Sequence, residues 1–250
     1  MTHSLQNKTA LITGASRGIG RAVALRLASD GAHVFAHYGS SREQADSLVA
    51  EIERFGGRAT AVQADLSDPQ AVETLARETQ GLLGGAKLDI LVNNAGVAEF
   101  VPFADTDAAT IDRQYAVNVR APFLLTKALR PALASDASVV FLSSVVAKNY
   151  FPDIPAYSIT KGAVDTLVQH LAAELGADGI RVNAVAPGVI ETDMSDWVRS
   201  EDGARNAKSI QALQRIGQPE DIAGTVAFLA GPDSGWVTGQ VIDTSGGTKL

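Results

Sequence analysis

The sequence predicts an α/β fold, a doubly wound parallel sheet of about seven strands flanked by helices. Three observations lead to this prediction. Short apolar runs alternate with longer amphipathic runs over nearly the whole chain, a pattern typical of strands that alternate with helices. The apolar runs are continuous, as in strands buried on both faces. A glycine-rich turn, "TGASRGIG" at 13–20, directly follows the first of them.

The elements are expected in a regular order along the chain. Apolar runs predict strands at 9–13, 32–38, 58–65, 88–94, 138–143, 180–187 and 240–244. Helical spacing predicts helices at 18–31, 42–57, 67–84, within 107–133, from about 155 to 178, and at 219–230. We expect residues 1–250 to form a single domain. Its longest stretch without a strand, 188–218, is expected to form a flap over a site, with a surface insertion of no special role as the alternative.

Composition excludes several classes of function. The chain has 250 residues, a formal net charge of -7 and no cysteine. It therefore has no disulfide, thiolate metal site or cysteine nucleophile, and its acidity argues against nucleic acid or an anionic membrane as partner. The four histidines have no metal-ligand spacing, so no metal is expected. Without a signal-like N-terminus or an apolar run of about 20 residues, we expect a cytoplasmic protein.

The glycine-rich turn predicts a dinucleotide site. It joins the first strand to the first helix, whose free N–H groups and positive dipole end can hold a pyrophosphate. The residues expected to line it are Gly14, Ser16, Arg17, Gly18, Ile19 and Gly20. A tight turn without a ligand is the alternative. In this context the fold prediction becomes a Rossmann-type one.

The end of the second strand predicts which dinucleotide binds. An NAD site usually has an acidic residue there for the ribose 2′-hydroxyl, and the nearest acid, Glu43, lies beyond the strand end and on the next helix. The positions carry Tyr38, Ser40, Ser41 and Arg42 instead, and Arg17 lies in the turn. Guanidinium and hydroxyl groups suit a 2′-phosphate, so NADP(H) is the expected cofactor. Solvated surface arginines and an NAD-dependent enzyme remain the alternatives.

The segment "SSVVAKNYFPDIPAYSITKG" at 143–162 contains candidate catalytic residues. Tyr157 and Lys161 are four residues apart, on one face of a helix that begins near Pro155. A cation beside a phenol lowers the phenol pKa, which brings tyrosine toward general acid–base work. Ser144 leaves the end of a strand, where ligands bind in open α/β sheets. Alone, such a pair is usually helix surface, so its value depends on the dinucleotide turn.

The sequence resembles the short-chain dehydrogenase/reductase family over nearly its whole length, and the 3-oxoacyl-acyl-carrier-protein reductases within it. The matching motifs are "TGASRGIG" (13–20), "NNAG" (93–96), "VNV" with Asn118, Ser144, "YSITK" (157–161), "APG" with "ETDM" (186–194), "PEDIA" (219–223) and "DTSGG" (243–247). The last motif departs from many relatives at Thr244 and Ser245, which leaves the subfamily open.

The resemblance implies a role for each matching residue. Tyr157 would give or take the proton, Ser144 would polarise the carbonyl, Lys161 would lower the Tyr157 pKa and bind the nicotinamide ribose, and Asn118 would hold a water that links Lys161 to solvent. It also implies that the adenine and nicotinamide ends of the cofactor are lined by Asp65, Leu66, Asn93, Ala95, Gly96, Tyr157, Lys161, Pro187, Gly188, Ile190 and Thr192.

The resulting prediction is an NADPH-dependent oxidoreductase that reduces a carbonyl to an alcohol, reversibly. A 3-oxoacyl thioester, a sugar, a small ketone and a cyclic ketone remain open as substrates, because Asn149, Tyr150 and Phe151, where the family shapes its substrate pocket, match no subfamily. Lys148 and Arg130 could attract an acyl-carrier protein, although the net charge of -7 argues against docking. An NAD-dependent alcohol or sugar dehydrogenase and a non-catalytic dinucleotide sensor are the alternatives. The resemblance further implies a homotetramer.

Overall fold

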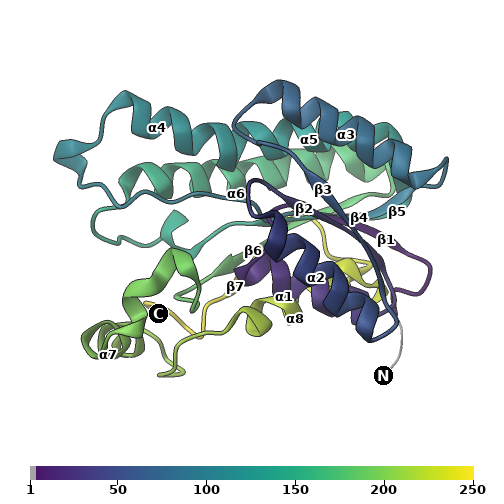
Figure 1. Cartoon of the computed structure of the whole chain (residues 1–250). Helices are drawn as coiled ribbons and strands as arrows, with labels where there is room; N and C mark the ends of the chain where they lie inside the picture. Colours follow the sequence, from purple (N-terminus) through teal and green to yellow (C-terminus); the bar gives the residue numbers. More distant parts are fainter. Residues whose placement is uncertain (1–3) are drawn as a thin grey trace.

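The sheet confirms the predicted fold. The structure is a computed structural model and describes residues 4–250, so His3 lies outside it. Within this range seven parallel strands follow the order β3-β2-β1-β4-β5-β6-β7 (Figure 1). They are β1 (Thr9–Ile12), β2 (His33–Tyr38), β3 (Arg58–Gln63), β4 (Leu88–Asn93), β5 (Leu133–Leu142), β6 (Arg181–Pro187) and β7 (Val241–Thr244). The order reverses between β1 and β4, where a crevice opens at the carboxyl ends of the strands.

Helices cover both faces of the sheet (Figure 1). One face is covered by α1 (Gly18–Ser29), α2 (Arg42–Arg54) and α8 (Pro219–Ala230), and the other by α3 (Pro69–Leu83), α4 (Ala108–Tyr115), α5 (Ala121–Leu129) and α6 (Pro155–Leu175). A further helix, α7 (Glu201–Ser209), lies away from the sheet. The short turns are η1 (Phe103–Asp105), the π-helical η2 (Ala116–Arg120), η3 (Arg130–Ala132), η4 (Val145–Ala147), η5 (Gly176–Asp178), η6 (Asp193–Arg199) and η7 (Pro232–Ser234).

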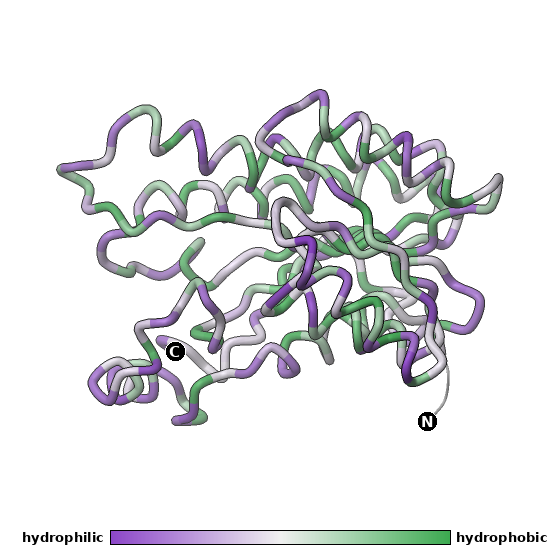
Figure 2. Tube along the Cα trace, viewed as in Figure 1, coloured by the Kyte–Doolittle hydropathy of each residue, from purple (hydrophilic) through white to green (hydrophobic). Residues whose placement is uncertain are grey.

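The continuous apolar strands build two cores, one on each face of the sheet. Successive strand side chains point to opposite faces, so Ala10 and Ile12 join the core under α1 and α8, while Leu11 joins the core under α3, α5 and α6. All three are fully buried. Figure 2 shows this as hydrophobic colour along the strands and on the inner sides of the helices. Burial on both faces explains why hydrophobic and polar residues do not alternate along these strands.

The helix expected at 67–84 is present as α3, which begins at Pro69. Asp68 is the N-cap, and its carboxylate accepts the Gln70 N–H at 2.9 Å, which satisfies one of the free donors of the first turn. Pro69 opens the helix, where its missing N–H costs nothing. Gly84 ends it with a φ of 57°. Local capping chemistry therefore sets both ends of this helix.

The expected helix within 107–133 is not continuous. It divides into α4, the π-turn η2 and α5. Pro122 has no N–H to donate, and its ring excludes the regular position of the carbonyl four residues back, that of Asn118. The Ala121 N–H donates to Ala116, five residues back, which is a π-helical bond. The strand expected at 138–143 also differs, since β5 begins at Leu133, where a first pairing to Leu88 precedes a shift in register.

The stretch 188–218 contains η6 and α7 and has a small core of its own. Val189, Val198 and Ala207 are buried there, and Ile210 and Ile216 pack against them. This cluster is separate from the two cores of the sheet. Among residues 4–250, no helix combines the length and the apolar character that crossing a bilayer requires.

Candidate active site

The predicted site residues meet at the carboxyl edge of the sheet. The turns that leave β1, β4, β5 and β6 all end there, next to the β1–β4 reversal. This is the position where open α/β sheets bind ligands. Residues from five widely separated parts of the sequence are thereby brought to one edge.

The glycine turn between β1 and α1 is tightly closed. Gly14 and Gly18 have φ angles of 65° and 54°, a region that L side chains rarely enter. A Cβ on Gly20 would lie 2.2 Å from the Gly14 carbonyl oxygen and 2.4 Å from Nδ2 of Asn94. The turn therefore requires glycine for two different reasons, backbone conformation and close approach.

Two residues that the sequence analysis did not assign to the site hold this turn against β4. Nδ2 of Asn94 donates to the Thr13 and Gly14 carbonyls, at 2.8 and 3.1 Å. The Thr13 hydroxyl accepts the N–H groups of Asn94 and Ala95, both at 3.0 Å. The second asparagine of "NNAG" was the signal that could have identified this role, because a buried turn needs side-chain donors.

His37 supports the turn from β2 and was also not assigned. It is 2% exposed. Its Nδ1 accepts the Gly14 N–H at 3.1 Å, and its Nε2 lies 3.1 Å from the Ala64 carbonyl. These partners require the neutral ring with its proton on Nε2. Burial lowers the pKa of His37 to about 4, against the opposing effect of the Ala64 hydrogen bond, so the ring is neutral at physiological pH.

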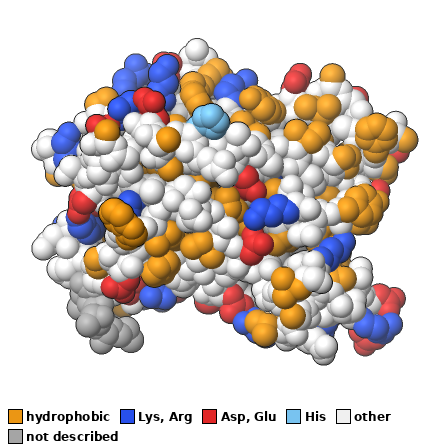
Figure 3. Space-filling model, turned by 180° about the vertical axis from the view of Figure 1, so that it is seen from behind, with side chains coloured by type: hydrophobic (Ala, Val, Ile, Leu, Met, Phe, Trp, Pro, Cys, Tyr) orange, Lys and Arg blue, Asp and Glu red, His pale blue; other side chains and the backbone are white. Residues whose placement is uncertain are grey.

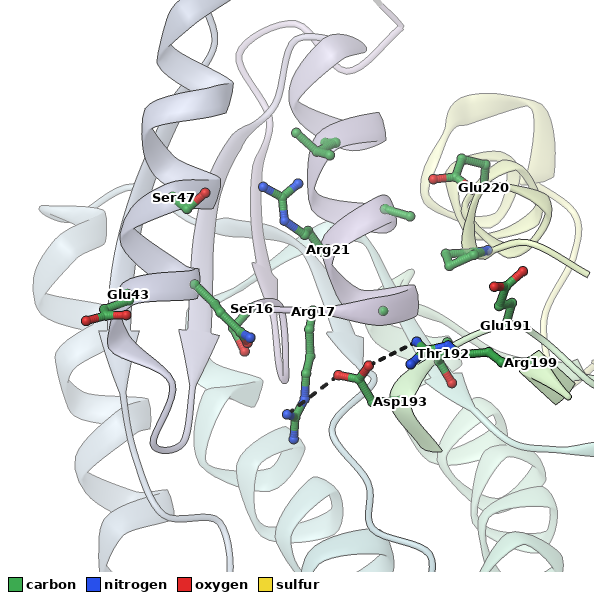
Figure 4. Close-up of a pocket in the computed structure, with 15 residues that line it drawn as sticks. Ser16, Arg17, Arg21, Glu43, Ser47, Glu191, Thr192, Asp193, Arg199 and Glu220 are labelled. Carbon is green, nitrogen blue, oxygen red and sulfur yellow. Dashed lines mark hydrogen bonds and ion pairs between the residues drawn. The ribbon is translucent and has the colours of Figure 1, made fainter. Parts of the chain in front are cut away.

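A cavity of about 520 Å³ opens on the outer side of the turn (Figure 4). Its lining combines α1, α2 and the stretch from Glu191 to Arg199. Arg17 points into it, and Nη1 of Arg17 lies 3.8 Å from Oδ2 of Asp193. The other oxygen of Asp193 lies 3.3 Å from Nη2 of Arg199. The cavity thus has a cation, Arg17, on the side of the glycine turn, and this cation pairs with the Asp193 carboxylate on the opposite side.

The four residues expected at the ribose end do not share this cavity. Arg42 is an exposed residue at the start of α2, and its Nε lies 3.4 Å from Oδ2 of Asp46. Tyr38 is buried at the end of β2, and Ser40 and Ser41 lie in the turn that follows. Among the expected phosphate ligands, Arg17 and Ser16 line the cavity, together with Gly18 and Thr192.

The turn after β4 packs closely against two of the expected catalytic residues. A Cβ on Gly96 would lie 3.3 Å from Oδ1 of Asn118 and 3.7 Å from Nζ of Lys161. Asn93 is buried, and its Nδ2 donates to the Thr126 hydroxyl at 3.2 Å. Its Oδ1 is buried without a partner. A buried acceptor of this kind and a bare backbone at Gly96 fit a polar ligand in this part of the crevice.

Asn118 lies at the centre of the π-turn. Its Oδ1 accepts the Val97 N–H at 2.9 Å, and its Nδ2 donates to the Val97 carbonyl at 2.8 Å and to the Thr160 hydroxyl at 3.1 Å. It therefore joins the turn after β4 to α6. Such π-turns occur often at functional sites. The break in the helix, caused by Pro122, aims this side chain inward.

Ser144, Tyr157 and Lys161 come together as predicted. Ser144 follows β5 and caps η4, and Tyr157 and Lys161 lie in the first two turns of α6. Nζ of Lys161 is 5.4 Å from the centre of the Tyr157 ring, and the Ser144 side chain lies close enough to the Tyr157 hydroxyl to lower its pKa. The choice of Ser144 over its neighbour is supported by Ser143, whose hydroxyl donates to Asp165, away from the tyrosine.

The expected lowering of the Tyr157 pKa by Lys161 is not what the structure gives. Burial raises the pKa of Tyr157 above its usual range, and the hydrogen bond from Ser144 offsets only part of this effect. Burial also lowers the pKa of Lys161 to about 8, while the nearby Asp165 carboxylate raises it. Loss of water penalises both charged forms. The Lys161 ammonium donates instead to the Leu142 carbonyl at 2.7 Å.

The remaining predicted residues lie around the same edge. Oδ1 of Asp65 accepts the N–H and hydroxyl of Ser67, which lowers the Asp65 pKa. Leu66 is buried beside it. Pro187 ends β6, and Ile190 pairs with Gly217. A Cβ on Gly18 would lie 3.4 Å from Cγ2 of Thr192, so the flap begins in contact with the glycine turn.

A dinucleotide fits the residues present. The turn before α1 offers backbone donors where no side chain can stand, Arg17 supplies a cation in the adjoining cavity, and Gly96 presents bare backbone close to Lys161. Tyr157 keeps its proton at neutral pH, as a proton donor must. No cluster of side chains within the described range could hold a metal ion. The arrangement can therefore place a bound dinucleotide beside a proton donor.

Comparisons with known proteins agree with this reading. Residues 14–249 match the family model described as enoyl-(acyl carrier protein) reductase. The chain is 37% identical to versicolorin reductase 1 of Aspergillus parasiticus, over 98% of this chain and 97% of the relative. It is similar to two solved structures, both with a TM-score of 0.94. The angucycline C-6 ketoreductase LanV with bound NADP is 37% identical, covering 99% of this chain and 97% of LanV. The promiscuous reductase LugOII, which catalyses keto-reduction at C1 in lugdunomycin biosynthesis, is 42% identical, covering 99% and 100%.

Proposed function

The chain belongs to the short-chain dehydrogenase/reductase family, and we propose that it is an NADPH-dependent reductase of ketones. The observation that carries the proposal is the meeting of Ser144, Tyr157 and Lys161 at the sheet edge that also holds the glycine turn. A non-catalytic dinucleotide-binding protein has no need of a half-buried tyrosine beside a hydroxyl and an ammonium. The ketoreductase names of LanV and LugOII support the reaction class.

The chain's own residues supply the acid–base part of the reaction. When bound, the nicotinamide supplies the hydride. Ser144 donates a hydrogen bond to the carbonyl oxygen and polarises it, and Tyr157 gives that oxygen its proton. Lys161 holds a positive charge beside them, anchored by the Leu142 carbonyl. Asn118 fixes the turn after β4 against α6. The reverse direction uses the same groups, with Tyr157 as proton acceptor.

Tyr157→Phe tests this assignment directly. The ring remains, so the fold and the affinity for NADPH should stay within about threefold of wild type, whereas turnover should fall by about a thousandfold because the proton donor is lost. NADPH consumption measures turnover, and the fluorescence of bound NADPH measures binding. Activity near that of wild type would mean that another group gives the proton.

The cofactor preference is proposed to depend on Arg17 more than on Arg42. Arg17 lines the cavity beside the turn, and LanV, a structural neighbour, holds NADP. Arg42 pairs with Asp46 on the surface of α2. We expect Arg17→Ala to lower kcat/KM for NADPH by about tenfold or more and to leave NADH nearly unaffected, because only NADPH has the 2′-phosphate. Arg42→Ala is the matched comparison. A wild-type preference for NADH would contradict the assignment.

For the substrate we propose a cyclic ketone rather than a 3-oxoacyl thioester. The observation in its favour is that LanV and LugOII, which match the full chain, are named as reductases of biosynthetic ketones rather than of acyl-carrier substrates. The net charge of -7 also gives little attraction for an acidic carrier protein. A panel containing a tetralone and a 3-oxobutanoyl thioester, followed by NADPH absorbance, decides between the two classes.

The proposed assembly is a cytoplasmic homotetramer of one catalytic domain, with residues 188–218 as a flap. Large apolar side chains remain exposed on the helical layer of α4, α5 and α6, among them Ile111, Tyr115, Phe123 and Ile159, each at least 42% exposed. The view from behind shows hydrophobic side chains in this upper half of the molecule (Figure 3). Covering such a face by another copy would bury apolar surface. Light scattering on the purified protein tests the assembly.

A further inference from the structure

The C-terminal tail, residues 246–250, is fixed to the end of the flap. Gln211 and Thr248 form an antiparallel bridge, and both are 4% exposed. The Lys249 N–H donates to the Ile210 carbonyl at 2.8 Å. Two further backbone bonds, from residues 212 and 213 to the glycines 247 and 246, measure 3.2 and 3.0 Å. In Figure 1 the C-terminus accordingly lies beside α7.

Glycines make this arrangement specific. Gly246 and Gly247 have φ angles of 63° and 74°, which direct the tail toward the flap. A Cβ on Gly247 would lie 2.7 Å from Cβ of Ala212. A Cβ on Gly188, at the other end of the flap, would lie 2.5 Å from the Thr248 hydroxyl oxygen. The tail therefore contacts both ends of the flap closely.

Lys249 reaches from this tail to a different part of the site. Its Nζ lies 4.1 Å from the centre of the Phe151 ring and 6.0 Å from that of Tyr150. It also donates a hydrogen bond to the Tyr150 carbonyl. A cation over an aromatic face and a charged donor on a carbonyl are both attractive contacts. Both aromatic residues belong to the segment 145–154, which joins Ser144 to the helix of Tyr157.

The second half of the segment 145–154 is held by contacts with the tail, whereas its first half forms a turn of its own. The Val145 carbonyl accepts the N–H groups of Lys148 and Asn149, at 3.1 and 2.9 Å, which orders the first half as a turn. Beyond that turn, Lys249 contacts Tyr150 and Phe151. A second link to the C-terminal part of the chain, from Lys148 to Asp243 on β7, is longer, at 3.5 Å, and belongs to the first half of the segment.

We propose that Lys249 is a specificity-determining residue. Lys249 ties the segment 145–154 to the tail, and the tail is bound to the flap. It thereby sets the distance between this segment and the flap, which form two walls beside the substrate carbonyl that Ser144 and Tyr157 act on. The inference rests on the proposed ketone reduction. A substrate large enough to touch the wall at Tyr150 and Phe151 depends on this separation, whereas a small ketone held by Ser144 and Tyr157 alone does not.

The test compares Lys249→Met, Lys249→Arg and Lys208→Met. Methionine removes the charge at similar length, arginine keeps a cation, and Lys208 is an exposed lysine on α7 that serves as control. With tetralone, we expect the KM of Lys249→Met to rise by about tenfold, with kcat within about threefold. With cyclopentanone, KM should stay within about twofold. The arginine and control variants should resemble wild type, and NADPH binding should be unchanged in all three.

Two kinetic results would overturn the proposal. One is an unchanged ratio of the two KM values in Lys249→Met. The other is an equal rise for both ketones together with weaker NADPH binding, which indicates a general structural defect. Chymotrypsin cleavage after Tyr150 is a readout independent of activity, and in Lys249→Met it should become faster by about tenfold because the segment is no longer held; an unchanged rate also overturns the proposal. If wild type reduces no ketone, the proposed function fails, and the cleavage rate still decides whether Lys249 holds the segment.

Discussion

His37 makes the stability of this protein depend on pH in a calculable way. The ring is buried under the glycine turn, and burial lowers its pKa from an ordinary 6.5 to about 4. The unfolded chain therefore binds the proton first as pH falls. Stability from this group is complete above about pH 6.5 and is lost as pH falls toward 4. The difference between the two pKa values corresponds to about 3 kcal/mol of unfolding free energy.

The assay compares wild type with His37→Gln. Glutamine does not titrate, yet it offers an acceptor for the Gly14 N–H and a donor for the Ala64 carbonyl. Urea unfolding is measured between pH 8 and pH 4 at one chain concentration, because the stability of an oligomer depends on it. The free energy difference, wild type minus variant, should stay constant above pH 7 and fall by about 3 kcal/mol by pH 4.

The comparison isolates His37 from the carboxylates that titrate in the same range, because these are common to both proteins. His170→Gln, at an exposed position of α6, is the control for loss of a histidine and should change the unfolding free energy by less than about 0.5 kcal/mol. A difference between wild type and His37→Gln that is flat from pH 8 to pH 4 would refute the reasoning. It would mean that His37 takes up its proton in the folded state as easily as in the unfolded chain.

Three further substitutions follow from contacts described above. Gly20→Ala places a methyl carbon 2.2 Å from the Gly14 carbonyl oxygen, so urea unfolding should show a loss of about 3 kcal/mol and NADPH fluorescence titration a loss of binding; normal binding contradicts this. Asp165→Ala leaves the Ser143 hydroxyl, next to Ser144, without its acceptor and removes a carboxylate that raises the Lys161 pKa, so kcat should fall about tenfold. Asp165→Asn keeps an acceptor but not the charge and should therefore lose less of the rate; equal rates in the two variants would exclude a role for the hydrogen bond. Arg181→Met removes three hydrogen bonds to the segment 229–234 and should cost about 3 kcal/mol in thermal or urea unfolding; an unchanged midpoint contradicts this.

The strands and the ends of the helices were predictable because local chemistry determines them. Continuous apolar runs indicate strands that are buried on both faces. Asp68 and Pro69 are residue types typical of a helix N-terminus, and α3 begins there. The π-turn at Asn118 was not predicted, although Pro122 was visible, since a proline in the first turn of a new helix and a proline that distorts a continuing one look alike in sequence.

The sequence predicted which residues belong to the site better than it predicted which other residues they contact. The spacing of four put Tyr157 and Lys161 on one face of α6, as the structure shows. Spacing alone could not show that Asn94 ties down the glycine turn or that Lys249 reaches Phe151, because both contacts join segments far apart in the chain. Such long-range contacts depend on the packing of the whole sheet, which no local pattern encodes.

The pKa shifts of Tyr157 and Lys161 depend on burial, which the spacing of charges in the sequence does not reveal. Proximity of a cation lowers a phenol pKa only if the cation keeps its charge and water does not dominate either group. Here burial acts on both partners, and it raises the pKa of Tyr157 while it lowers that of Lys161 to about 8. The lysine remains charged at neutral pH because it has the Leu142 carbonyl as acceptor and the Asp165 carboxylate nearby. A tyrosine that holds its proton is the form that carbonyl reduction requires, so the protonation state of Tyr157 fits the proposed reaction.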